Sequence, residues 1–169
     1  PLYEVLLDSV IKHLPNPIEA QKYRIPKIWQ GDIESQFGKD LLNCNKDGEI
    51  AFVITNTTID PKSGKEVHAG RLFSGTIRPG MDVYLNTEKK KAKIQQVLVY
   101  NGIKPEQLES VPSGNVLAIT GIVSEPSETI TVSPQEPFEN IRHIFEPVIT
   151  KSISVSKAQD LPKLIEVLK

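Results

Sequence analysis

The clearest pattern of hydrophobic and polar positions lies between His68 and Leu85, in the sequence HAGRLFSGTIRPGMDVYL. Larger side chains alternate there with small or polar ones, and alternation with a period of two is typical of a half-buried β-strand. The pattern is interrupted at Pro79 and Gly80. Proline fixes φ at about −65° and glycine accepts positive φ, so this pair suits the centre of a type II turn. The sequence therefore predicts two strands joined as a hairpin.

Similar short runs, separated by turn residues, recur between residues 38 and 134. The further strands predicted from them are Ile50–Thr57, Glu88–Tyr100, Asn115–Ile122 and Thr129–Val132. Asn101–Gly102 is a strong signal for chain reversal, and Lys104–Leu108 is predicted to form one helical turn. About six strands with no long helix between them favour a mainly β fold, an antiparallel barrel, over a parallel sheet.

The N-terminal part has a different pattern. Residues 1–14 carry apolar side chains at helical spacing, which predicts a helix with one apolar face. Pro15 and Pro17 are expected to end that helix, because proline removes a backbone donor and disfavours helix in the residue before it. Residues 15–37 are interpreted as a polar, irregular linker. Its apolar side chains, which we expect to anchor it against neighbouring domains, are Ile25, Ile28 and Trp29.

The C-terminal part resembles the beginning of another domain. A second linker is predicted at residues 135–147, followed by an alternating strand at Val148–Val155. Apolar residues within Leu161–Leu168 repeat at i, i+3, i+4 and i+7, as in an amphipathic helix. One strand and one helix cannot enclose a core, so residues 148–169 are predicted to be the truncated start of an α+β domain. Both ends of the chain fall inside predicted secondary structure, and we expect the chain to be part of a longer protein.

Composition narrows the class of protein. Hydrophobic residues make up 38% of the 169 residues, which is enough for a globular core, and the formal net charge is −1. A nearly neutral chain has no overall field that attracts DNA or a membrane surface, so any contact with a polyanion must be local. No apolar run is long enough for a membrane helix, and no leader pattern opens the chain. We therefore expect a soluble, cytoplasmic protein with no membrane or DNA partner.

No residue pattern predicts catalysis. Cys44 is the sole cysteine, which excludes an internal disulfide and a multi-cysteine metal site. Gly75–Gly80 has the glycine spacing of a phosphate-binding loop, but Met81 and Asp82 stand where that loop needs a lysine and a hydroxyl residue. We expect no catalytic, cofactor-binding or metal-binding residue in this chain.

The most informative charge feature is the run KKKAK at residues 89–93. On a strand, Lys89, Lys91 and Lys93 would project to one side and Ala92 to the other. One interpretation is that these lysines prevent a sheet edge from pairing with other chains. The alternative is contact with a phosphate backbone, which gives affinity through counterion release without sequence specificity. No aromatic residue interrupts the run, which disfavours stacking on single-stranded bases.

Four stretches of the chain resemble the archaeal and eukaryotic elongation factor 2 family, which comprises ribosomal translocases. They are Leu14–Ile25 (LPNPIEAQKYRI), Gly38–Cys44 (GKDLLNC), Gly70–Leu85 (GRLFSGTIRPGMDVYL) and Pro112–Ile122 (PSGNVLAITGI). The first stretch is specific to this family among translational GTPases. The helical segment Leu161–Leu168 is similar to the opening helix of the family's third domain.

The resemblance implies a division into parts. Residues 1–14 would be the closing helix of a GTP-binding domain, 38–134 the second domain, a translation-protein β-barrel, and residues from 148 the start of a ferredoxin-like third domain. GTP and Mg²⁺ would bind the parent factor upstream of Pro1. The barrel would pack against the GTP-binding domain and contact small-subunit ribosomal RNA. No family catalytic residue falls within the chain.

Two functions remain to be distinguished. The first is a non-catalytic segment of a GTP-dependent translocase that docks on the ribosome and relays between domains. The second is a free-standing β-barrel that binds RNA through Lys89, Lys91 and Lys93. The chain itself is expected to bind no guanine nucleotide.

Overall fold

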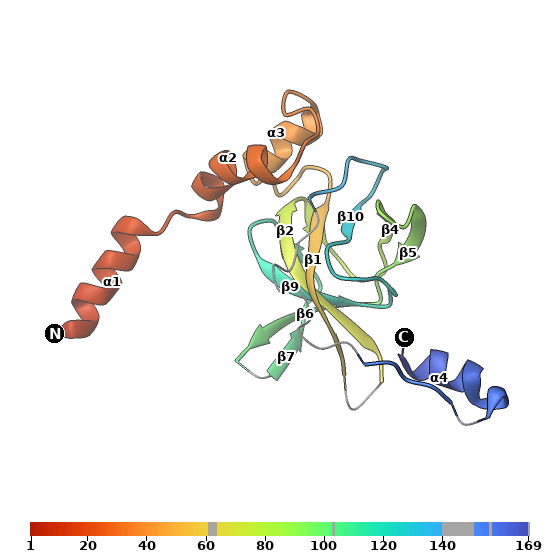
Figure 1. Cartoon of the computed structure of the whole chain (residues 1–169). Coiled ribbons are helices and arrows are strands. Elements are labelled where there is room, and N and C mark those ends of the chain that lie inside the picture. The colour runs from red at the N-terminus through yellow and green to blue at the C-terminus, as the bar shows by residue number, and fades with distance from the viewer. Residues whose placement is uncertain (61–63, 103, 140–150, 156, 169) are drawn as a thin grey trace.

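The computed structural model describes residues 1–60, 64–102, 104–139, 151–155 and 157–168. Within these residues, one antiparallel sheet has eight strands in the order β5-β4-β10-β1-β2-β9-β6-β7, and a second sheet pairs β3 with β8 (Figure 1). The strands are β1 (Ala51–Ile59), β2 (Glu66–Ser74), β3 (Thr76–Ile77), β4 (Asp82–Leu85), β5 (Lys90–Lys93), β6 (Gln96–Asn101), β7 (Lys104–Gln107), β8 (Val111–Pro112), β9 (Val116–Thr120) and β10 (Thr129–Thr131).

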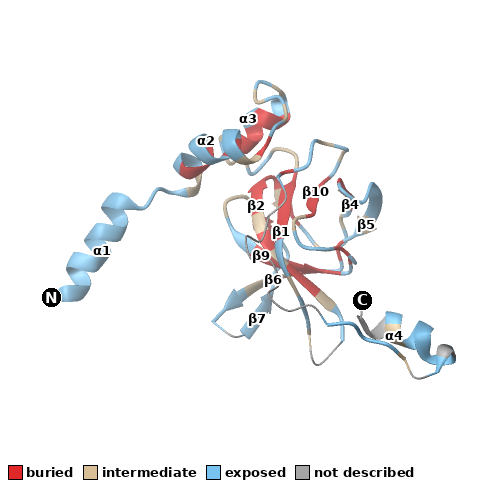
Figure 2. Cartoon of the chain, viewed as in Figure 1, coloured by how far each residue is buried: buried red, intermediate tan, exposed pale blue. Residues whose placement is uncertain are grey.

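The strands enclose one apolar core. Burial of each large aliphatic side chain in such a core contributes about 1.5–3 kcal/mol. Figure 2 shows the buried residues concentrated along the central strands, from β10 to β6. The fully buried members of this core are Phe52, Ile54, Leu72, Ile77, Leu85, Ile94, Val97, Ile119 and Ile130. The mainly β, antiparallel barrel expected from the sequence is confirmed.

The two strands around Pro79–Gly80 are present, but they do not form a hairpin. β2 pairs with β1 and β9, whereas β4 pairs with β5 and β10. β2 ends just before Gly75, where φ is +78°. The next two residues, Thr76 and Ile77, form β3 and pair with β8 instead. The turn at residues 79–80 is real, and Gly80 adopts a φ of +84°. The prediction of a hairpin was wrong because an alternating pattern identifies strands but not their partners.

Helices occupy the segment that was interpreted as an irregular linker. α2 (Pro17–Ile28) begins at Asn16, whose side-chain oxygen accepts a hydrogen bond from the backbone nitrogen of Glu19 at 2.9 Å. Pro17 suits the first helical position, where its missing N–H costs nothing. Pro26 lies inside this helix. α3 (Gln36–Leu42) is capped by Ser35, whose hydroxyl accepts from the Gly38 backbone nitrogen at 3.0 Å.

A second apolar cluster attaches these helices to the barrel. Trp29 contacts Phe37 edge to face, with ring centroids 5.5 Å apart, and Phe73 of β2 stacks on Phe138 at 5.0 Å. The buried Gln21 amide donates to the carbonyl oxygens of Leu41 and Phe73. The anchoring role predicted for Trp29 is therefore confirmed, although its partners lie on α3 and beyond β10. This packing stabilises α2 despite its internal proline.

The helices predicted at the two ends of the chain are present, but the predicted C-terminal strand is not found in the described residues. α1 (Leu2–His13) was predicted, and it buries none of its residues (Figure 2). α4 (Leu161–Leu168) was also predicted and follows the short helix η1 (Ala158–Asp160). The strand predicted at 148–155 falls partly outside the described residues, and residues 151–155 form no strand. Among the residues that the structure describes, no helix combines the length and apolar character needed to cross a bilayer.

The reversal predicted at Asn101–Gly102 joins β6 to β7, with Asn101 opposite Lys104. The helical turn predicted at Lys104–Leu108 was wrong, because residues 104–107 pair with β6 as a strand. Pro105 is tolerated there because β7 is an edge strand, and only one side of an edge strand needs its donors paired.

Candidate nucleic-acid interface

The lysine run lies on a hairpin at one edge of the sheet. β4 and β5 pair in the register Asp82↔Lys93, Tyr84↔Lys91 and Leu85↔Lys90, so residues 86–89 form the turn. β5 is the terminal strand in the sheet order. This position leaves open both interpretations made from the sequence, edge protection and phosphate contact.

The structure brings two of the three candidate lysines onto one strand face. Lys91 and Lys93 are exposed, whereas Ala92 packs against the core and Ile94 is fully buried. Lys89 is exposed too, but it precedes β5 and has a φ of +53°, in the left-handed region. It therefore projects from the turn rather than from the strand. Among the described residues, the three lysines form no salt bridge.

Lys90 differs from its neighbours because it has partners. Its ammonium group forms a salt bridge with Glu88 and donates a hydrogen bond to the carbonyl oxygen of Val123 at 3.1 Å. Burial of the Glu88 carboxylate opposes ionisation, but the hydrogen bond from Lys90 and the charge of Lys90 keep the pKa of Glu88 below its ordinary value. At neutral pH these two charges compensate each other. The hairpin lysines left without a salt bridge in the described residues are Lys89, Lys91 and Lys93, of which Lys93 lies opposite Asp82.

The turn that carries Lys89 is held from below by a buried carboxylate. Glu128 is only 3% exposed. Its Oε1 atom accepts hydrogen bonds from the backbone nitrogens of Thr87 (2.8 Å) and Thr129 (3.0 Å), and Oε2 accepts from that of Glu88 at 3.2 Å. Hydrogen bonds to ionised acceptors are stronger than neutral ones. Glu128 thus fixes the backbone of the turn from a position just before β10.

Asn86 supplies the second anchor. Its amide nitrogen donates to the Thr129 carbonyl oxygen (2.9 Å) and the Thr131 hydroxyl (2.8 Å), and its side-chain oxygen accepts from the Gln135 backbone nitrogen at 2.8 Å. This side chain is buried, and both of its amide hydrogens and its oxygen bond to other parts of the protein. Sequence reasoning missed both Asn86 and Glu128, because neither belongs to a motif and their partners are distant in the chain.

Tyr84 was also missed. The sequence shows no aromatic residue within the lysine run, but strand register places Tyr84 directly opposite Lys91. Its ring is half-buried and borders the same hollow as Lys89. The available signal was the alternation of Val83, Tyr84 and Leu85, which puts Tyr84 on the face opposite the two buried residues. The surface therefore combines cations with one aromatic face.

These features suit a polyanion better than a reaction. No group of three His, Cys, Asp or Glu side chains in the described parts of the chain is arranged to hold a metal ion. Lysine ammonium groups on a rigid hairpin can neutralise phosphates and release condensed counterions. Such contacts position a nucleic acid without reading its sequence.

Comparison with known proteins agrees with the fold. Residues 66–131 match the family described as elongation factor Tu domain 2, and this range contains the β4–β5 hairpin. The whole chain aligns with elongation factor 2 of Pyrococcus abyssi (49% identity over 170 residues), Pyrococcus furiosus (48% over 170) and Archaeoglobus fulgidus (48% over 171). Each alignment covers 100% of this chain and 23% of the relative. The chain therefore spans about a quarter of the length of these relatives, and along its whole length it is similar to one segment of proteins named elongation factor 2.

Proposed function

We propose that this chain acts in translation elongation, as the non-catalytic barrel of a factor that drives GTP-dependent translocation of tRNA and mRNA on the ribosome. The observation that carries the proposal is the identity of 46–49% to relatives named elongation factor 2 along the entire chain. The fold supports it, because residues 66–131 match a domain of elongation factor Tu. In this proposal the factor works in the cytoplasm.

The chain's own contribution is docking. Lys89, Lys91 and Lys93 would contact the phosphate backbone of small-subunit ribosomal RNA, while Lys90 stays paired with Glu88. Support comes from the exposure of the three lysines and from the fixed turn beneath Lys89. Edge protection remains compatible with the same residues, since a lysine can block strand pairing and still bind phosphate.

The remaining parts relay between domains. In this proposal residues 1–14 close the GTP-binding domain, 15–37 and 135–147 connect domains, and residues 148–169 begin the third domain. The fully exposed α1 fits this division, because its apolar side chains have no partner within the described residues. GTP and Mg²⁺ would bind the GTP-binding domain of the parent factor. The barrel would pack against that domain without taking part in hydrolysis.

Co-sedimentation with small ribosomal subunits tests the docking role. The full-length factor with Lys89, Lys91 and Lys93 all replaced by alanine is expected to pellet less than the unmodified factor at the same salt concentration. The matched control is the double variant Glu88→Gln/Lys90→Gln, which removes the internal salt bridge without changing net charge. Unchanged pelleting of the triple variant would reject the lysine contact.

Nucleotide binding tests the assignment of parts. The chain should show no affinity for GTP, because the phosphate-binding pattern at Gly75–Gly80 lacks its lysine and forms part of the barrel. Binding of a fluorescent GTP analogue at micromolar concentration would contradict the division. RNA binding by the isolated chain, without any effect on ribosome binding of the full factor, would favour the free-standing RNA-binding module instead.

A further inference from the structure

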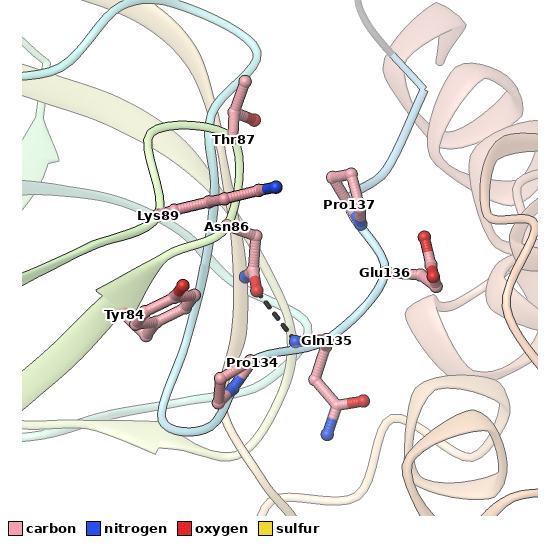
Figure 3. Close-up of a pocket in the computed structure, with 8 residues that line it drawn as sticks. All are labelled: Tyr84, Asn86, Thr87, Lys89, Pro134, Gln135, Glu136 and Pro137. Carbon is pink, nitrogen blue, oxygen red and sulfur yellow. Dashed lines mark hydrogen bonds between the residues drawn. The ribbon is translucent and has the colours of Figure 1, made fainter.

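A cleft of about 640 Å³ opens between the β4–β5 hairpin and the segment that follows β10 (Figure 3). Tyr84 and Lys89 line it from the hairpin, and Pro134 and Pro137 line it from the opposite side. Its volume lies within the range of about 300–1,000 Å³ that is usual for pockets that hold small organic groups. Figure 3 shows the Lys89 side chain extending from the turn towards Pro137.

The far wall of the cleft is fixed at several points. The Gln135 backbone nitrogen donates to the Asn86 side chain at 2.8 Å, and the Phe138 backbone nitrogen donates to the Thr129 hydroxyl at 2.9 Å. Between these two bonds, the Trp29 indole nitrogen donates to the Glu136 carbonyl oxygen at 2.8 Å. The wall is therefore attached both to the barrel and to Trp29, the residue that follows α2. A preformed wall lowers the entropy cost of binding.

The lining of the cleft combines aromatic, apolar and cationic side chains. Tyr84 offers an aromatic ring, the two prolines offer apolar surface, and Lys89 offers a single cation at the rim. Asn86 contributes no free donor, because both of its amide hydrogens are used within the protein. The one acidic residue of the lining, Glu136, points away from Lys89 in the view of Figure 3. A flat ring next to a phosphate would match this arrangement.

We propose that the cleft receives one unpaired nucleotide of a structured RNA, with its base against Tyr84 and its phosphate at Lys89. This inference rests on the proposed RNA contact of the lysine hairpin and specifies its ligand. Any of the four bases can stack on an aromatic ring. In folded RNA, the bases free to do so are the unpaired bases of loops and bulges, which can turn outwards from the helix. Lys91, directly opposite Tyr84, lies next to the cleft and would hold the adjoining phosphate backbone.

Three short RNA hairpins test the proposal by fluorescence anisotropy with the 169-residue chain. One carries a single bulged adenosine, the second has an abasic residue at the bulge, and the third is fully paired. The chain is expected to bind the adenosine bulge about 5- to 150-fold more tightly than the abasic bulge, which is the contribution of one stacked base. Equal binding of these two hairpins would overturn the proposal.

Substitutions of Tyr84 separate stacking from structure. Tyr84→Leu keeps a bulky apolar side chain and should remove the preference for the adenosine bulge, whereas Tyr84→Phe keeps the ring and should retain it. Tyr100→Leu is the matched control, because Tyr100 is an exposed tyrosine on β6, on the other side of the sheet order. A preference that survives Tyr84→Leu, or that Tyr100→Leu abolishes equally, would reject the site.

The triple lysine variant separates failure of the nucleotide site from failure of the docking proposal. If the triple lysine variant loses affinity for all three hairpins and the unmodified chain shows no bulge preference, the docking proposal stands and the nucleotide site is rejected. If the unmodified chain binds none of the hairpins, the cleft is not an RNA site and a peptide partner becomes the better candidate.

Discussion

Replacing Glu128 by glutamine tests whether the buried carboxylate holds the lysine turn. Glutamine has nearly the same shape, but only one of its two terminal atoms can accept a hydrogen bond. Its oxygen can still serve the Thr87 and Thr129 nitrogens, which now bond to Oε1, whereas its NH₂ group would face the donor of Glu88. The variant therefore loses one charge-assisted hydrogen bond.

The expected cost follows from that loss. A hydrogen bond to a charged group contributes about 1.5–3 kcal/mol, and we expect Glu128→Gln to lower the free energy of unfolding by about this amount. The weaker bonds that remain to Thr87 and Thr129 are offset by the smaller desolvation cost of a neutral amide. Because urea m-values for small proteins are about 1–3 kcal/mol per molar, the unfolding midpoint should fall by about 1 M.

Urea unfolding followed by circular dichroism and by the fluorescence of Trp29, the single tryptophan, measures this midpoint. Glu125→Gln is the matched control, because Glu125 is an exposed carboxylate in the same loop. Amide exchange adds a local readout, since the Thr87 and Glu88 amide hydrogens should exchange faster only in Glu128→Gln. A midpoint indistinguishable from that of Glu125→Gln, with unchanged exchange, would refute the role assigned to Glu128.

Three further predictions concern the wall of the cleft, the break after β2 and the ion pair on the hairpin. Trp29→Phe removes the indole donor to the Glu136 carbonyl and should lower the free energy of unfolding by about 1–3 kcal/mol. Thermal unfolding followed by circular dichroism measures this loss, and no change would argue against that bond. Gly75→Ala should lower the free energy of unfolding in urea by about 2–4 kcal/mol, because φ is +78° and a Cβ atom would lie 2.7 Å from the Ile50 Cα. Gly80 also has positive φ, but the space around it is open, so Gly80→Ala should cost about 1–2 kcal/mol. Equal costs for the two variants would contradict the clash at Gly75. Because the folded-state pKa of Glu88 is lowered, its stabilisation is present above the ordinary value of 4.5 and is lost as the pH falls below it, so Glu88→Gln should flatten the acid limb of stability against pH; an unchanged limb would contradict this.

Most strand positions could be predicted from the sequence because alternation is a local property, but the single strand predicted at Glu88–Tyr100 was wrong, since these residues form β5 and β6. Ile50–Thr57 and Thr129–Val132 overlap β1 and β10 closely, and the reversal at Asn101–Gly102 is present. Strand partners could not be predicted in the same way. Nothing in the residues around Pro79 indicates that β4 pairs with β10 rather than with β2, because that choice is made by contacts far along the chain.

The helix α2 shows a second limit of sequence reasoning. Pro17 at the start of residues 17–28 and Pro26 within them argued for an irregular linker, yet tertiary packing of Ile25 and the hydrogen bonds of Gln21 stabilise a helix there. Local propensity is a weak prior that packing overrides. The lysine run was visible as a charge pattern, but the pairing of Lys90 and the position of Lys89 in a turn needed the folded hairpin.

The salt dependence of binding tests the central claim most directly. Affinity of the full-length factor for small ribosomal subunits should be measured over a salt series for the unmodified protein, the triple Lys→Ala variant and the control Glu88→Gln/Lys90→Gln. Three lost phosphate contacts should flatten the slope of log K against log salt by about 2–3, equivalent to about 16- to 64-fold between 50 and 200 mM salt. The control should keep the unmodified slope. A triple variant with unchanged affinity and slope would contradict the account.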